Sequence, residues 1–189
     1  GAVLPDQPDV SIGCDNHHGG RAIGEHLLAQ GCRNIAFIGD ASNHFPEFQD
    51  RYLGFAEALD EAGLEVDPAL QVDAETTEQS GYEATRQLTA SGVPFDAVFA
   101  ASDLIAFGAL RALDEHGLKV PEDVAVAGYD DIPMARFVNP ALTTVQQDTR
   151  QAGEMLVDAL LRMIRGEKVE SIILPVKLTV RRSSLRGAK

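Results

Sequence analysis

The stretch that decides the fold runs from Asp96 to Gly117 and reads DAVFAASDLIAFGALRALDEHG. Its opening residues, 96–100, form a short apolar run of the kind that fills a strand buried on both faces. Apolar residues then recur at the i, i+3, i+4 spacing of a helix and stop at a glycine that suits a C-cap: Ile105, Gly108, Ala109, Ala112 and Leu113. The stretch therefore predicts a buried strand that leads directly into an amphipathic helix.

The same unit recurs on the N-terminal and C-terminal sides of this stretch. Residues 35–39 and 124–128 are comparable apolar runs, and helical spacing precedes both Gly31 and Gly63. Strands that alternate with helices of this length form right-handed βαβ units in an open sheet. We therefore expect an α/β fold with a doubly wound parallel sheet.

The pattern changes after Pro140. A short β-branched run at 143–145 precedes a helix that is apolar on one face, and two strand segments follow at 172–174 and 176–180. Pro175 separates these two segments because proline cannot donate to a sheet ladder. The C-terminal part thus predicts one more strand and helix, followed by two short strands.

Charge and composition exclude several classes of protein. The chain has 16 Lys and Arg against 29 Asp and Glu, a formal net charge of −13, and such a surface repels a phosphate backbone. We expect this part not to hold nucleic acid by itself.

No apolar stretch approaches the roughly 20 residues that span a bilayer, and the start lacks a secretory signal, which favours the cytoplasm. Cys14, Cys32 and the five histidines show no ligand spacing, so we expect no metal site and no cofactor.

Polar side chains follow the strands at one edge of the predicted sheet. Ligands of open α/β sheets bind beyond the carboxyl ends of the strands. The polar residues at those ends are Asp40, Asp73, Thr76, Thr77, Ser102, Asp103, Asp130 and Asp131. A cluster of four of these aspartates, 40, 103, 130 and 131, could instead hold Mg²⁺ for phosphoryl chemistry, but turn and capping roles already explain two of them.

Some of these residues have competing explanations. Asp103 lies where a strand turns into a helix, so we expect it to cap the first N–H groups of that helix. Ser102 either faces the cleft or serves as a simple turn residue. Adjacent residues at a strand end project to different sides, so at most one of Asp130 and Asp131 faces a ligand. A hydrogen-bonding role for either of them competes with a solvated turn.

Arg51 is an unusual cation for its position. The sequence places it in the first turn of a helix, where a positive charge opposes the helix dipole and needs compensation. An arginine at the mouth of an Asp-rich cleft can bind a carboxylate or neighbouring hydroxyl groups of a ligand. A salt bridge to Asp50 or Glu47 explains it equally well.

Leu104, Phe107 and Leu110 form a second apolar stripe on the helix that starts near Asp103. Such a stripe indicates either a subunit interface or a helix packed on two sides of a large core. The residues alone favour the core position.

Several segments together resemble the lac repressor (LacI/GalR) family of transcriptional regulators over nearly the whole chain. They read GGRAIGEHLLAQGCRNIAFIGD, RYLGFAEALDEAGL, SGYEATRQL, FDAVFAASDLIAFGALRAL, GLKVPEDVAVAGYDDIPMA, NPALTTVQQD and ILPVKLTVRRSS.

The resemblance implies a periplasmic-binding-protein-like fold with a ligand between two lobes. Residues 1–30 and 149–175 would form part of the DNA-proximal lobe, and 31–148 and 176–189 the distal lobe. Family members carry a helix-turn-helix head and further strands before the point that matches the first residue, so we expect the head to be absent and the proximal lobe incomplete.

The resemblance also implies roles for individual residues. Arg51 matches the ligand-binding arginine of the family's RxxGF motif, and Asp130 matches the effector-contacting first aspartate of GYDD. Further positions at or near the ligand are Ser102, Thr76, His18 and Asp15. Several relatives stack an aromatic ring on the effector where this chain has Thr76, so such stacking is not expected here.

Phe107, Leu110 and Val138 match positions at the subunit interface of the family. With the resemblance in hand, the stripe that includes Leu104 is therefore expected at a dimer interface rather than in the core.

These features together predict a non-enzymatic sensor. A small polar effector, a sugar or sugar derivative, would bridge Arg51 and Asp130 and control operator DNA binding of a homodimer allosterically. Substituting Arg51 by Ala is expected to abolish binding and leave the fold intact. The alternative is a periplasmic sugar-binding receptor of a transporter, and a third hypothesis is a metal-dependent hydrolase.

Overall fold

The computed structural model describes residues 10–42 and 44–187 and contains one large sheet. Its six strands lie in the order β3-β2-β4-β5-β6-β8, and their bounds are β2 (Ile35–Ile38), β3 (Gln71–Val72), β4 (Ala97–Ala100), β5 (Ala125–Asp130), β6 (Thr143–Gln146) and β8 (Lys177–Thr179). Neighbouring strands are parallel except β6 and β8, which are antiparallel. The predicted α/β class with a doubly wound, largely parallel sheet is confirmed.

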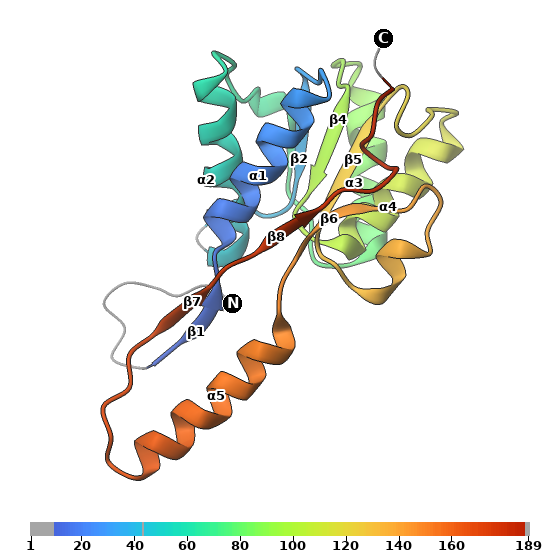
Figure 1. Cartoon of the computed structure of the whole chain (residues 1–189). Helices are drawn as coiled ribbons and strands as arrows, with labels where there is room; N and C mark the ends of the chain where they lie inside the picture. The colour runs from blue at the N-terminus through green and yellow to red at the C-terminus, as the bar shows by residue number, and fades with distance from the viewer. Residues whose placement is uncertain (1–9, 43, 188–189) are drawn as a thin grey trace.

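Four helices cover the two faces of this sheet. They are α1 (Asn16–Ala29), α2 (Pro46–Glu61), α3 (Glu78–Ser91) and α4 (Asp103–Glu115). Figure 1 shows α1 and α2 on one side of the sheet and α3 and α4 on the other. The glycines predicted as C-caps have left-handed φ angles, 84° at Gly31 and 72° at Gly63 and Gly117, which end these helices as expected.

The fully buried strands β2 and β4 form the centre of the core. Phe37 on β2 contacts Phe55 of α2 and Phe99 of β4, with ring centroids 6.2 and 5.2 Å apart. All three rings are 0% exposed, and burying each one stabilises the fold by roughly 1.5–3 kcal/mol. This packing fixes α2 against the carboxyl ends of the two strands.

Helices α1 and α2 approach each other closely. A Cβ added at Gly20 would overlap the carbonyl of Arg51, and one added at Gly54 would overlap the carbonyl of His17. Only glycine allows backbones this close. The contact brings the first turns of α1 beside the middle of α2.

A smaller group of elements lies apart from the large sheet. β1 (Ile12–Cys14) pairs in parallel with β7 (Ile172–Leu174), and α5 (Thr149–Ile164) extends away from the large sheet on this side (Figure 1). α5 exposes large apolar side chains, namely Leu156, Val157, Leu160, Leu161, Met163 and Ile164. Most of the apolar side of α5 is therefore open to solvent in the described part of the chain. No helix among the described residues is long and apolar enough to cross a membrane.

The position of α1 differs from the lobe boundary expected at residue 30. That boundary would group α1 with β1 and α5, but α1 packs along α2 and against the large sheet. The reason is that Ile23 and Leu27, both 0% exposed, belong to the large core.

Candidate functional site

Arg51 is the centre of the candidate site. α2 begins at Pro46, so Arg51 lies in its second turn, and the expectation of a first-turn position against the helix dipole is wrong. The residue is 4% exposed, and its Nε donates to Oδ1 of Asn16 at 2.9 Å. Its Nη1 donates to the carbonyl of Ala101, directly after β4. The guanidinium thus joins α1, α2 and the end of β4.

Two aromatic rings enclose this guanidinium. Its Cζ lies 3.7 Å from the ring centre of Tyr129 and 5.3 Å from that of Phe48. Burial lowers the pKa of Arg51, and the nearby Asp130 carboxylate opposes that shift. Because arginine is not deprotonated in proteins, the site contains a desolvated positive charge.

The ion pair of Arg51 is with Asp130, at the end of another strand. Nη2 lies 3.7 Å from Oδ1 of Asp130. Within the described residues neither Asp50 nor Glu47 forms an ion pair with Arg51. The explanation by a local salt bridge is therefore wrong, because Arg51 lies on the buried face of α2.

Asp130 ends β5 and keeps part of its carboxylate accessible. Its φ is 116°, and its side chain is 31% exposed. Oδ1 accepts a hydrogen bond of 2.6 Å from Nε2 of Gln147. Burial raises the pKa of Asp130, while Arg51 and the bond from Gln147 oppose the rise. The exposed part of this carboxylate is an acceptor beside the donors of Arg51.

Asp131 points in a different direction. Its Oδ1 accepts from Nη2 of Arg181 at 2.7 Å, and its side chain is only 4% exposed. Its backbone N–H donates to Oγ1 of Thr144 at 3.3 Å. The predicted divergence of Asp130 and Asp131 is confirmed, and Asp131 anchors the turn rather than facing Arg51.

Ser102, and not Asp103, supplies the side-chain cap of α4. Oγ of Ser102 accepts from the N–H of Ile105 at 3.3 Å and caps α4. Asp103, the first helical residue, accepts instead from Oγ1 of Thr144 at 2.6 Å and from the N–H of Ile132 at 2.9 Å. The prediction that Asp103 is the cap is wrong because its side chain turns toward the sheet. Ser102 is 1% exposed, and its ligand contact stays a prediction.

The remaining predicted ligand residues lie around this centre. Asp15 caps α1 by accepting from the N–H of His18 at 2.9 Å, and its carbonyl accepts a long bond of 3.5 Å from the Tyr129 hydroxyl. His18 is exposed in the first turn of α1, and Thr76 is exposed just before α3. No hydrogen bond joins Thr76 to Arg51 in the described part of the chain. Ligand contacts of these three residues stay predictions.

Three members of the site were missed from the sequence. Asn16 follows β1 and Gln147 follows β6, so both lie near the end of a strand, as the selected residues do. Tyr129 immediately precedes Asp130, and its buried ring lies over Arg51. The strand-end rule would have found the first two if it had been applied to every strand.

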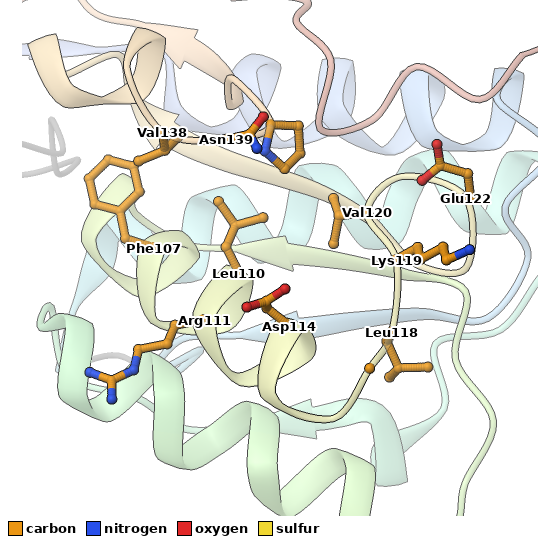
Figure 2. Close-up of a pocket in the computed structure, with 12 residues that line it drawn as sticks. Phe107, Leu110, Arg111, Asp114, Leu118, Lys119, Val120, Glu122, Val138 and Asn139 are labelled. Carbon is orange, nitrogen blue, oxygen red and sulfur yellow. The ribbon is translucent and has the colours of Figure 1, made fainter.

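The stripe on α4 borders a hollow (Figure 2). Phe107, Leu110 and Val138 line a cavity of about 690 Å³ together with charged residues. Figure 2 shows Phe107 and Leu110, both from α4, facing the segment of Val138 and Asn139. Phe107, Leu110 and Leu104 are all half-buried, so the dimer interface stays a prediction.

The magnesium alternative finds no geometric support in residues 10–42 and 44–187. There, no group of three or more His, Cys, Asp or Glu side chains is placed to hold a metal ion. Asp103 and Asp131 already have protein partners, and Asp40 accepts a hydrogen bond from the N–H of Ser42 at 2.8 Å.

Known proteins resemble this chain along nearly its whole length. The profile of the periplasmic binding protein-like domain matches residues 25–184. A protein from Sanguibacter keddieii, described as a LacI-family transcriptional regulator, has a solved structure with 38% identity and a TM-score of 0.87, covering 97% of this chain and 70% of its own. The chain belongs to the lac repressor family. The transcriptional regulator CelR of Thermobifida fusca is 38% identical over 95% of this chain and 53% of its own length.

Two members of the lac repressor family have structures with bound partners. A complex of the regulator CelR with cellobiose has 38% identity and a TM-score of 0.89, covering 95% of this chain and 55% of its own. A lac repressor dimer bound to operator has 32% identity and a TM-score of 0.88, covering 97% of this chain and 55% of its own. The chain thus spans about half the length of the curated relatives it matches. These relatives are regulators rather than enzymes, which favours a regulator over the receptor and hydrolase hypotheses.

Proposed function

We propose that this chain is the effector-sensing region of a LacI-type transcriptional regulator and binds a small polar ligand between Arg51 and Asp130. The geometry of this pair carries the proposal. Nη2 of Arg51 and Oδ1 of Asp130 lie 3.7 Å apart, too far for a full hydrogen bond. A hydroxyl group both donates and accepts. It can therefore accept from the guanidinium while it donates to the carboxylate.

A sugar or sugar derivative fits this pair best. Its adjacent hydroxyl groups offer several donor and acceptor pairs to a planar guanidinium and a carboxylate. Tyr129 and Phe48 hold the guanidinium in place before a ligand arrives, so little side-chain entropy is lost on binding. Similarity to a regulator in complex with cellobiose supports this ligand class.

The ligand lies between two lobes in this proposal. We place residues 31–148 and 176–189 in the distal lobe and residues 149–175 together with β1 in the DNA-proximal lobe, whereas α1, although it falls within the range 1–30 expected for the proximal lobe, packs on the distal side. The separation of β1, β7 and α5 from the large sheet supports the division. The open apolar side of α5 suits the interior of a larger lobe. A ligand that contacts both lobes favours one of their relative arrangements.

The whole regulator acts as a homodimer on operator DNA in this proposal. Leu104, Phe107, Leu110 and Val138 face the second subunit, and a helix-turn-helix head outside this chain contacts the operator in the cytoplasm. The half-buried apolar stripe of α4 and the similarity to an operator-bound dimer support this assembly.

Titration of the ¹⁵N-labelled chain with cellobiose, followed by NMR, tests the ligand site. We expect the amide signals of Ala101, Asp130 and Gln147 to shift together, and we expect these shifts to vanish in Arg51→Met. Arg21→Met is the control, since Arg21 pairs with exposed glutamates on the outer side of α1 and α2. Equal shifts in both variants would refute the site. No shift of these signals with cellobiose or ribose would contradict binding of these two sugars by the Arg51–Asp130 pair of this chain.

A further inference from the structure

Asp103 is an acidic side chain with no exposed surface, 0%. Its two oxygens contact two different elements. Oδ1 accepts from the hydroxyl of Thr144 on β6 at 2.6 Å, and Oδ2 accepts from the N–H of Ile132, which follows β5, at 2.9 Å. A carboxylate in such a place is costly unless hydrogen bonds satisfy it, and here both oxygens are satisfied.

Both contacts of Asp103 reach the turn that carries Asp130. Ile132 is two residues beyond Asp130, and Oγ1 of Thr144 also accepts from the N–H of Asp131 at 3.3 Å. The φ angles of Asp130 and Asp131 are 116° and 51°. Side chains other than glycine rarely adopt such backbone conformations, and the surrounding contacts must hold them.

Neither helix capping nor simple space filling explains this carboxylate. Ser102 already supplies the side-chain cap of α4, although a negative charge at the first helical position still gains from the dipole. Burial raises the pKa of Asp103 to about 7, against the effect of its hydrogen bonds. Gly128 on β5 leaves room for the carboxylate, since a Cβ there would lie 2.5 Å from Oδ1 of Asp103. The position thus accommodates a charged group at a cost in solvation.

We propose that Asp103 is a positioning residue that holds residues 130–132 in place and so directs the Asp130 carboxylate toward the ligand. Thr144 is its partner, because one hydroxyl group bridges the Asp103 carboxylate and the N–H of Asp131. The inference rests on the proposed function for the ligand, but the effect on the turn exists without a ligand.

Two valine substitutions on β6 separate positioning from simple stability. Thr144→Val removes the hydroxyl that bridges Asp103 and the turn. Thr143→Val removes an equally buried hydroxyl that donates to the carbonyl of Arg181 at 2.9 Å and accepts from the Arg181 N–H and the Ser184 hydroxyl. We expect the melting temperature to fall at least as much in Thr143→Val as in Thr144→Val. Only Thr144→Val should weaken cellobiose binding, by up to about tenfold, because the ligand must then reorder the turn that the lost hydrogen bond held in place. Asp103→Asn keeps an acceptor for the Ile132 N–H and should have an intermediate effect.

Hydrogen exchange of the Asp131 and Ile132 amides provides a readout that needs no ligand. Exchange at these two amides should become faster in Thr144→Val and stay unchanged in Thr143→Val, relative to the core strands. Unchanged exchange in Thr144→Val would overturn the positioning role even if the wild type binds no sugar. If the wild type binds cellobiose and both variants bind it equally, the proposal for Asp103 is wrong and the ligand site stands.

Discussion

Replacing Arg51 by Met separates the structural part of this residue from its expected contact with a ligand. Methionine has a similar length and can keep apolar contact with Tyr129 and Phe48, but it loses the hydrogen bonds to Asn16 and Ala101. It also leaves Asp130 without its cation. Alanine would add a cavity to these losses, so the expectation that Arg51→Ala leaves the fold intact does not agree with the packing.

The loss of stability can be estimated from these contacts. Two hydrogen bonds to a charged group are each worth roughly 1.5–3 kcal/mol. Loss of the cation beside the partly exposed Asp130 carboxylate adds less than the roughly 3–5 kcal/mol that removing one partner of a fully buried ion pair costs. Burying the guanidinium costs solvation free energy, and this cost offsets part of the stability that these contacts provide. We expect Arg51→Met to lower the free energy of unfolding by about 3–5 kcal/mol. For a chain of this size that lowers the melting temperature by roughly 6–20 °C.

Urea unfolding followed by circular dichroism measures this loss, and the chain has no Trp to report by fluorescence. Arg21→Met is the matched control, because it removes the same charge from an exposed cluster and should have a much smaller effect. Adding Asp130→Asn to Arg51→Met should recover part of the loss, since it removes the unpaired carboxylate. If Arg51→Met is as stable as Arg21→Met, Arg51 does not hold these elements together.

Three further predictions concern other parts of the molecule. Burial raises the folded-state pKa of Asp103 to about 7, above about 4 in the unfolded chain. The folded state therefore binds more protons between these pH values, and its stability should fall as pH rises from 4 to 7. Asp103→Asn should remove most of this pH dependence in thermal melts at several pH values, and an unchanged dependence would contradict the assignment. Phe107→Glu should shift any dimer toward monomer in sedimentation velocity with little change in circular dichroism, whereas a dimer that persists would place the interface elsewhere. Gly54→Ala should lower the free energy of unfolding by more than about 2 kcal/mol because the added methyl overlaps the backbone of α1. Gly153→Ala on α5, which has open space around it, should raise this free energy by about 0.5–1 kcal/mol. Equal melting temperatures of the two variants would contradict the close approach of α1 and α2.

Local patterns predicted the βα units well because their signals lie within single segments. The helices that end at Gly31, Gly63 and Gly117 have the expected left-handed glycines, since a C-cap depends only on a few neighbouring residues. The buried runs became β2, β4 and β5 for the same reason. The antiparallel β8 was predicted as a strand, but its pairing with β6 depends on how the chain returns from the smaller group of elements.

The partners of the site residues could not be predicted in the same way. Arg51 bonds to Asn16 because two glycine contacts bring α1 close to α2, and that crossing is a property of the tertiary packing. Asp103 was assigned the cap because helix starts favour aspartate, but the adjacent Ser102 occupies that geometry. Its carboxylate was then available to Thr144 of β6, 41 residues away, and no local pattern specifies the place of β6 beside β5.

The open apolar side of α5 has a consequence for handling this chain in solution. Leu160 and Ile164 are 58% and 73% exposed, and contiguous exposed apolar surface promotes self-association. The formal net charge of −13 opposes this by repulsion between molecules. Added salt shortens the range of that repulsion to about 10 Å at 0.1 M and leaves the apolar attraction in place. The colloidal stability of the isolated chain should therefore decrease as ionic strength rises, and low-salt buffers should keep it dispersed.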